Sequence, residues 1–144
     1  MNLDDANMNA GTAIDLPVET GSFETGNVLP LLHEIRHALQ RLIETGEDTT
    51  IDLRSIPLAP GEEARLEEVL GQGEVEATLR ALGPSEMRET SIPGVWRVTH
   101  FNENESVIGK FIEITRVPSV LCTQPEDIRD GMVALERLLE DRDE

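Results

Sequence analysis

The spacing of the apolar residues changes twice along this chain of 144 residues, and those changes limit the folds it can adopt. From residue 27 to 46 apolar side chains recur every three or four positions, which is typical of one face of an α-helix. From residue 74 to 81 apolar and polar residues alternate, which is typical of a strand with one face in water. Helical spacing returns after residue 125. This pattern predicts an α+β domain with helices packed on one face of a largely antiparallel sheet, in the order helix, strand, helix, strand meander, helix.

Local signals set the expected limits of these elements. Asn27 fits the N-cap of the first helix, and Gly46 ends it. A short strand, 49–53, comes next, and the second helix begins at Pro60 and ends at Gly71. The expected strands of the meander are 75–81, 86–92, 95–101 and 107–115, and a capping-box spacing at 123–126 introduces the last helix.

The first and the last helix each carry an apolar stripe that we expect to face the sheet. The stripe of the first helix consists of Val28, Leu31, Leu32, Ile35, Ala38, Leu39, Leu42 and Ile43. The stripe of the last helix consists of Ile128, Met132, Leu135, Leu138 and Leu139.

The first 26 residues differ in composition from the remainder. They hold five acidic residues and no basic one, and glycine, alanine and proline interrupt their few apolar positions. Such a segment buries too little apolar surface to offset the entropy lost on ordering. We therefore expect a mobile acidic tail at 1–26 and a single domain at 27–144.

The charge balance narrows the partners of the chain. Twelve basic residues against 29 acidic ones give a formal net charge of −17, which repels nucleic acid and anionic membrane surfaces. The expected partners are basic or apolar, and the simpler alternative is an acidic surface that only maintains solubility. No stretch approaches the roughly 20 apolar residues of a membrane span, and no basic region followed by an apolar run opens the chain. We therefore expect no membrane span, no secretory signal and a cytoplasmic location.

The single cysteine, Cys122, cannot form a disulfide within the chain, which permits a reducing compartment. It lies just before the last helix, where a helix N-terminus can activate a thiol. Two interpretations stay open, a reactive thiol and a small apolar residue packed in the core.

One turn of the first helix carries the pattern H-E-x-x-H, in which His33 and His37 would bind zinc and Glu34 would act as general base. The apolar stripe centres on Ile35, so both histidines are expected to face solvent. An arginine also lies inside the motif, and His100, the only further histidine, has no telling spacing. We expect no catalytic residue, cofactor or metal site, and keep a zinc hydrolase with ligands His33 and His37 as the alternative.

The segment 93–96 places the only tryptophan, Trp96, at the start of a strand beside a turn. A lone tryptophan at this position fits either the core or an interface anchor at a strand edge.

Nine short segments occur in a recognisable series between residues 27 and 140. They are 31–39 (LLHEIRHAL), 51–54 (IDLR), 71–77 (GQGEVEA), 82–86 (LGPSE), 88–90 (RET), 93–96 (PGVW), 111–115 (FIEIT), 117–118 (VP) and 124–128 (QPEDI). In this order they resemble the HupH/HyaF (HoxQ-like) hydrogenase expression and formation proteins. The resemblance spans nearly everything outside the tail.

This resemblance implies a non-catalytic role in the maturation of uptake nickel–iron hydrogenases. Relatives are thought to act as chaperones for the iron–sulfur small-subunit precursor, which carries a twin-arginine export leader, before it is assembled. The implied partners are that precursor and other hydrogenase accessory proteins. Many family members are longer, with additional or duplicated domain sequence. Two interpretations follow: this unit works as a homodimer, or it performs part of the family's task.

The residues expected to contact a partner lie in the resembling segments and are Trp96, Glu74, Glu76, Glu86 and Arg88. We hypothesise that the acidic surface attracts the twin-arginine leader, and that an exposed sheet edge near Trp96 binds an extended peptide as an added strand. A generic acidic adaptor, unrelated to hydrogenase, is the second alternative to the maturation role.

Overall fold

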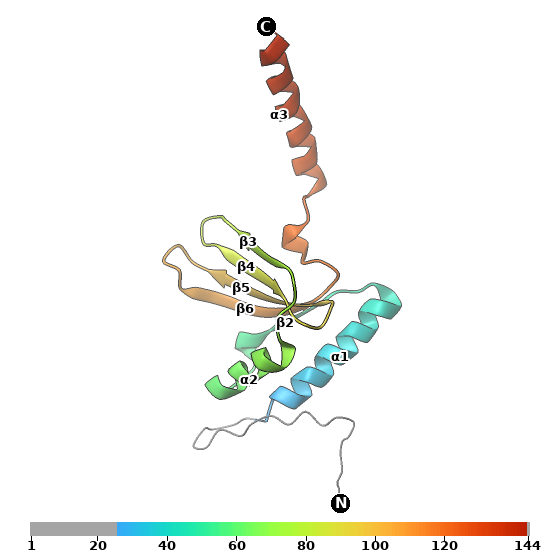
Figure 1. Ribbon diagram of the computed structural model, residues 1–144, viewed down its shortest axis with the longest axis vertical. Helices are drawn as coiled ribbons and strands as arrows, with labels where there is room; N and C mark the ends of the chain where they lie inside the picture. Colours follow the sequence, from blue (N-terminus) through green and yellow to red (C-terminus); the bar gives the residue numbers. More distant parts are fainter. Residues whose placement is uncertain (1–25, 144) are drawn as a thin grey trace, which may run out of the picture.

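The computed structural model describes residues 26–143, so the acidic tail expected at 1–26 lies outside the described residues apart from Gly26. Two helices and a curved sheet form the body of the molecule, and a third helix extends away from it (Figure 1). The elements are α1 (Val28–Thr45), β2 (Thr49–Asp52), the 3-10 turn η1 (Leu53–Ser55), α2 (Pro60–Leu70), β3 (Glu76–Leu79), β4 (Ser85–Glu89), β5 (Val95–Phe101), β6 (Val107–Ile114), the 3-10 turn η2 (Ser119–Leu121) and α3 (Pro125–Asp143).

The five strands form one sheet in the order β2-β6-β5-β4-β3, and every neighbouring pair is antiparallel. Strands β3 to β6 form a meander, in which each strand pairs with the next one in the sequence. Strand β2 joins the far side by pairing with β6, where Ile51 lies opposite Ile112. The α+β class and the antiparallel sheet predicted from the sequence are therefore confirmed.

Helix α1 begins and ends as its sequence predicts. Gly46 adopts the left-handed conformation, with φ of 75°, and its N–H donates to the carbonyl of Leu42. The buried part of the stripe consists of Val28, Leu31, Ile35 and Ala38. Ile43 was expected in the same stripe, but it lies in the last turn of the helix and is 83% exposed.

The main core lies between the two helices and one face of the sheet. Its buried members are Leu31, Ile35, Ala38, Ile51, Leu66, Leu70, Val95, Ile112 and Ile114. They come from α1, α2 and strands β2, β5 and β6, so the core joins the first third of the described chain to its last strand. Because these side chains are aliphatic, the core forms with few aromatic residues, as the composition requires.

A buried carboxylate, Glu62, connects the starts of the two helices. Its side chain accepts hydrogen bonds from the backbone N–H groups of Ala59 (3.0 Å), Gly26 (2.9 Å) and Asn27 (3.4 Å). The bond from Ala59 satisfies a free donor at the N-terminus of α2, and the other two satisfy donors at the N-terminus of α1. Glu62 is only 1% exposed, so this arrangement fixes how the two helices meet.

The opposite face of the sheet carries a second, smaller core. It consists of Met87, Trp96 and Val98, with Ala77, Phe111 and Leu121 packed around them. Trp96 lies in β5, which pairs with β4 on one side and β6 on the other. Of the two positions that the sequence left open for Trp96, the core and a strand edge, the structure shows the core, because Trp96 is 5% exposed and β5 is the central strand. The exposed sheet edge that we expected near Trp96 is therefore wrong. The edges are β2 and β3.

Strand β3 shows the limits of the alternation rule. Its apolar residues were expected to face the core, but Val75 beside it is 45% exposed and Leu79 is 37% exposed. The strand is at the sheet edge, where only Ala77 reaches the second core. Alternation therefore identified the strand but not the extent of its burial.

Helix α3 does not pack on the sheet. The fold predicted from the sequence placed its apolar stripe against the sheet, but in the structure the helix projects from the body (Figure 1). Its large apolar side chains are all between 42% and 60% exposed. Within residues 26–143 no helix, α3 included, combines the length and apolarity needed to cross a bilayer.

Candidate functional site

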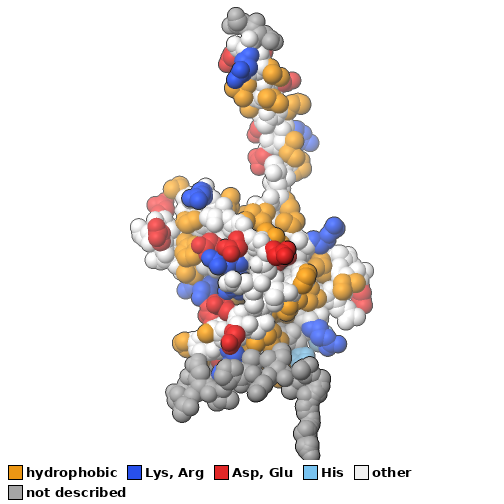
Figure 2. Space-filling model, viewed as in Figure 1, with side chains coloured by type: hydrophobic (Ala, Val, Ile, Leu, Met, Phe, Trp, Pro, Cys, Tyr) orange, Lys and Arg blue, Asp and Glu red, His pale blue; other side chains and the backbone are white. Residues whose placement is uncertain are grey.

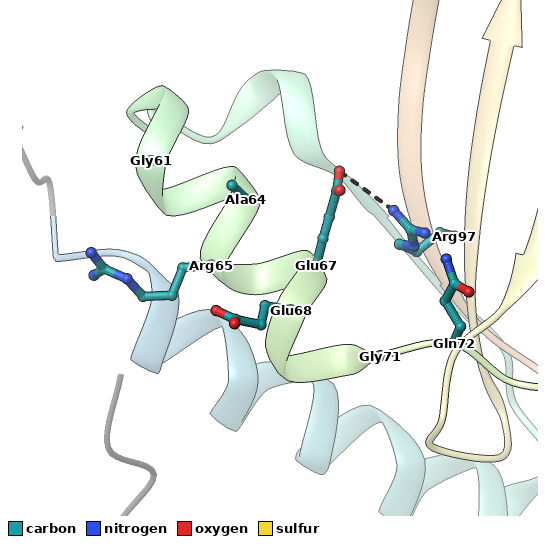
Figure 3. A pocket seen from close by; sticks show the side chains of 8 residues that line it. All are labelled: Gly61, Ala64, Arg65, Glu67, Glu68, Gly71, Gln72 and Arg97. Atoms are coloured by element: carbon teal, nitrogen blue, oxygen red, sulfur yellow. Dashed lines mark ion pairs between the residues drawn. The ribbon is translucent and has the colours of Figure 1, made fainter. Parts of the chain in front are cut away.

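A groove with charged walls lies between α2, the turn that follows it and strand β5 (Figure 3). Its volume is about 550 Å³, and a neighbouring polar hollow of about 310 Å³ extends it toward β4. Three side chains, Glu67, Gln72 and Arg97, line both. A continuous polar surface therefore connects the helix to the middle of the sheet.

Two glycines shape the turn that carries Gln72 into this groove. Gly71 has a φ of +66°, and a Cβ atom there would lie 2.8 Å from the Ser91 hydroxyl oxygen. A Cβ atom on Gly73 would lie 2.4 Å from the carbonyl oxygen of Thr90, closer than real Cβ contacts come. The turn therefore depends on glycine at both positions.

Arg97 is the central charge of the groove. It projects from β5 toward α2, and its Nη1 lies 3.4 Å from Glu67 Oε2 (dashed in Figure 3). The Arg97 side chain is only 21% exposed, and its buried Nε has no hydrogen-bond partner among residues 26–143. A largely buried guanidinium with a single carboxylate partner is a fixed positive charge, suited to a carbonyl or carboxylate group of a ligand.

A second set of charges continues the groove onto β4 and β3. Arg88 lies 3.6 Å from Glu86 and 3.9 Å from Glu76. These pairs are exposed and contribute little stability individually. Glu86 and Arg88 line the smaller hollow together with Arg97. The result is a surface on which acidic and basic groups alternate.

The structure brings together three of the five residues that the sequence singled out for partner contact. Glu76, Glu86 and Arg88 form one cluster, and Glu74 lies at the nearby turn, where its N–H donates to Glu89 Oε1 at 3.3 Å. Trp96 does not join them. It is 5% exposed and belongs to the core on the opposite face of the sheet.

Four residues at the centre of the groove were not predicted from the sequence as partner-binding residues. These are Glu67, Gln72, Arg97 and Thr99. One signal was present in the sequence: Arg97 is the only charged residue in the run Val-Trp-Arg-Val at 95–98. A charge inside an apolar strand must find a polar partner or a solvent path. The partners on α2 carried no comparable signal, because they are ordinary polar residues of a surface helix.

The histidines of the H-E-x-x-H pattern lie on the solvent-facing side of α1, as their spacing indicated. His33 and His37 are both exposed, whereas Ile35 between them is buried. His100 lies with the second core, on the sheet face opposite α1, and so cannot join them. Residues 26–143 contain no group of three or more His, Cys, Asp or Glu side chains arranged to hold a metal ion.

A serine–histidine contact does occur on that opposite face. Ser85 Oγ lies 2.6 Å from His100 Nδ1, and the His100 ring meets Phe111 edge-on at 5.6 Å between centroids. Such a hydrogen bond is one requirement of an activated nucleophile, but catalysis also requires access for a substrate. Ser85 is 7% exposed and lies directly opposite His100 in the strand register. The contact therefore joins β4 to β5.

Glu113 is a partly buried acid on the same face as Trp96, its cross-strand neighbour. Burial raises the pKa of its carboxyl group, because removal from water disfavours the charged form. His100 opposes this shift and Asp48 reinforces it, both by Coulomb interaction. Glu113 is therefore a source of pH dependence in the fold.

Cys122 is exposed at the end of η2, just before α3. Its Sγ lies 3.9 Å from the carbonyl oxygen of Pro118, a weak contact at most. The interpretation of Cys122 as a packed core residue is therefore wrong. The thiol is accessible to reagents.

The fold and groove define a small α+β domain built on a single antiparallel sheet, with a surface of alternating charges beside its second helix. Residues 25–141 match the family model described as "HupH hydrogenase expression protein, C-terminal conserved region". The chain therefore belongs to the HupH hydrogenase expression protein family.

Several known proteins resemble the chain over this region. It is 34% identical over 116 residues to the hydrogenase expression/formation protein HoxQ of Azotobacter vinelandii, covering 79% of this chain and 41% of that protein. It is 31% identical over 114 residues to HupH of Rhizobium leguminosarum bv. viciae, covering 79% and 40%. The chain thus spans about two fifths of the length of these curated relatives.

A solved structure resembles most of the chain. It is the hydrogenase expression protein HupH from Thiobacillus denitrificans, which is 43% identical and superimposes with a TM-score of 0.79. The match covers 83% of this chain and 99% of that one. A chain of this extent therefore occurs as a folded unit in a second member of the family.

Proposed function

We propose that this chain is a non-catalytic maturation factor that holds the iron–sulfur small-subunit precursor of an uptake nickel–iron hydrogenase before assembly and export. The observation that carries the proposal is the family match, which spans nearly the entire described domain. The relatives over this region are named for hydrogenase expression and formation. The proposal places the chain in the cytoplasm, where such a precursor is made.

The groove beside α2 is the surface that we propose to bind this client protein, the small-subunit precursor. Glu67, Glu68 and Glu86 supply negative charge to attract a basic leader, whereas Arg88 and Arg97 offer donors to carbonyl groups of an extended segment. Because acidic and basic groups alternate along the groove, a bound segment must place its own charges opposite them in one register. A uniformly basic segment would place some of its charges beside Arg88 or Arg97 and would bind less well. The groove is therefore suited to recognition of a sequence and not only of net charge.

The overall charge of the chain would act at longer range. A net charge of −17 accelerates encounter with a cationic leader, and salt screens that effect over roughly 10 Å at 0.1 M. The association rate should therefore fall as ionic strength rises, while the dissociation rate changes little. An association rate independent of salt would remove the electrostatic part of the proposal.

The direct test measures binding of the purified chain to the small-subunit precursor with its leader intact. The variant Glu68→Gln/Glu86→Gln removes two charges from the groove and should weaken binding about tenfold, on the scale of partly exposed interface charges. The matched control Glu47→Gln/Glu103→Gln removes two exposed charges outside the groove and should bind as the wild type does. Equal weakening by both variants would show that net charge, and not the groove, attracts the client.

A leader with its residues scrambled separates a dedicated factor from a generic acidic adaptor. The scrambled peptide keeps the charge but loses the order that the groove would recognise, so it should bind more weakly. Equal binding of both peptides would favour the adaptor. Capture of the precursor from hydrogenase-producing cells by the tagged chain completes the test, and absence of every hydrogenase component from the captured material would refute the maturation role.

A further inference from the structure

Helix α3 carries six of the fifteen large apolar side chains that are exposed among residues 26–143. Ile128, Met132, Leu135, Leu138 and Leu139 are each more than half exposed. Apolar side chains line α3 where it stands clear of the body (Figure 2). Lone helices of this length are marginal in water, and amphipathic helices gain most of their stability by covering the apolar face. The face therefore requires a partner.

The spacing of this face is that of a coiled-coil seam. Ile128, Met132, Leu135 and Leu139 are separated by four, three and four residues, the alternation that the a and d positions of a heptad repeat show. The seam thus indicates another helix as the partner.

We propose that this partner is the α3 helix of a second copy of the chain, packed antiparallel. In this arrangement Ile128 faces Leu139 of the second copy, and Met132 faces its Leu135. The residues that flank the seam on one copy then pair favourably with those on the other copy. Arg129 of each copy lies beside Glu136 of the other, and Leu138 of each lies over Gly131 of the other. Among residues 26–143, nothing beyond the helix's own neighbouring residues comes within 4 Å of the position that a Cβ on Gly131 would take.

Repulsion between the two acidic chains favours the same antiparallel orientation. Each chain carries a net charge of −17, and a parallel pair would place two acidic bodies side by side at one end of the helices. An antiparallel pair places them at opposite ends. A parallel pair would also bring Glu136 beside Gly131 and Arg129 beside Gln124, which gives no pair of opposite charges. Both the flanks and the bodies therefore favour the antiparallel form.

The interface is short, which determines how strong the dimer can be. The 19 residues of α3 extend over roughly 28 Å, and a pair of such helices buries less than the roughly 1,200 Å² of a standard interface. The dissociation constant should therefore lie in the micromolar range, on the order of 10 μM. The fraction of dimer would therefore rise as the protein concentration rises through the micromolar range and fall on dilution.

The first test is the mass of the full chain in solution over a series of concentrations, measured by sedimentation equilibrium. The wild type should shift from monomer to dimer, and Leu135→Asp should weaken the dimer at least a hundredfold by placing a charge in the seam. Ile43→Asp introduces the same charge at an exposed apolar residue of α1 and should leave the dimer unchanged. A monomer at all concentrations, or an assembly larger than a dimer, would overturn the proposal.

Exchange of the flanking charges tests the register without disturbing the seam. Arg129→Glu or Glu136→Arg alone replaces two attractive contacts per dimer with repulsive ones and should weaken the dimer about tenfold. The double variant restores both contacts in reversed order and should recover the wild-type affinity. Failure of the double variant to recover would refute the antiparallel register.

The single cysteine reports the orientation directly. Cys122 is exposed at the base of α3, so it can carry a spin label. An antiparallel pair places the two labels roughly 35 Å apart along the helix axis, whereas a parallel pair places them within roughly 10 Å, the distance between packed helices. A distance in the longer range supports the proposal, and one in the shorter range overturns it.

Discussion

Removal of the buried Glu62 carboxylate should detach the start of α1 from the start of α2. The side chain is 1% exposed and accepts hydrogen bonds from the backbone N–H groups of Ala59, Gly26 and Asn27. In Glu62→Ala these donors lose their acceptor. Gly26 and Asn27 can regain water if the helix end frays, whereas Ala59 at the N-terminus of α2 has less opportunity to do so.

The magnitude follows from the number and type of these bonds. A hydrogen bond to a charged group contributes about 1.5–3 kcal/mol, and the bond to Asn27, at 3.4 Å, belongs below that range. Removal of the buried charge also relieves its desolvation, which offsets part of the loss. We expect Glu62→Ala to reduce the free energy of unfolding by about 3 kcal/mol, and the melting temperature by roughly 10–15 °C. Glu62→Gln retains one acceptor oxygen and should lose about half as much.

Urea titration followed by circular dichroism measures this loss, with Glu68→Ala as the control. Glu68 lies on the same helix and is exposed, so its replacement should change the stability by less than about 0.5 kcal/mol. Hydrogen exchange of the Leu31 and Ile35 amides adds local information, because fraying of α1 should accelerate exchange of the Leu31 amide first. Equal stabilities of Glu62→Ala and Glu68→Ala would refute the reasoning.

Three further replacements test separate parts of the fold. Gly73→Ala places a Cβ 2.4 Å from the Thr90 carbonyl oxygen and should destabilise the domain by about 2 kcal/mol in urea titration; an unchanged midpoint would contradict the close approach. Ser85→Ala removes the hydrogen bond to His100 and should reduce stability by about 1 kcal/mol, which differential scanning calorimetry can resolve; a wild-type melting curve would show that the contact contributes nothing. Burial raises the pKa of Glu113, so its stabilising protonated form is present below the unfolded-state pKa and lost as pH rises through the folded-state pKa. Glu113→Gln should therefore be more stable than the wild type at neutral pH and equal to it at low pH, and a constant difference across a pH series would exclude titration of Glu113 as the cause.

Local features of the fold were predictable from the sequence because they depend on neighbouring residues. Gly46 and Pro60 mark the end of one helix and the start of another in the structure as in the sequence pattern. The hairpin between β5 and β6 also falls where expected, since Asn102 Oδ1 accepts from the N–H groups of Asn104 and Ser106. Caps and turns of this type are specified within a few residues.

Features that depend on distant residues were not predictable. The exposed sheet edge expected near Trp96 was wrong, because β5 pairs with β4 on one side and β6 on the other, and the edges of the sheet are β2 and β3. The groove was missed for a related reason, since Glu67 and Arg97 meet only after α2 docks on the sheet. The apolar stripe of α3 was identified correctly but assigned to the wrong surface, because periodicity identifies an apolar face and not what covers it.

The pairing of β2 with β6 has a consequence for synthesis of the chain on the ribosome. Strands β3 to β6 can form hairpin by hairpin as they emerge, whereas β2 must wait for the residues opposite it, such as Ile112, which are made much later. Until then the apolar stripe of α1 has no sheet to cover, although the helix itself is complete. The nascent chain therefore exposes its most apolar helix while residues 46–114 are made, and the step that protects it is completion of the last strand.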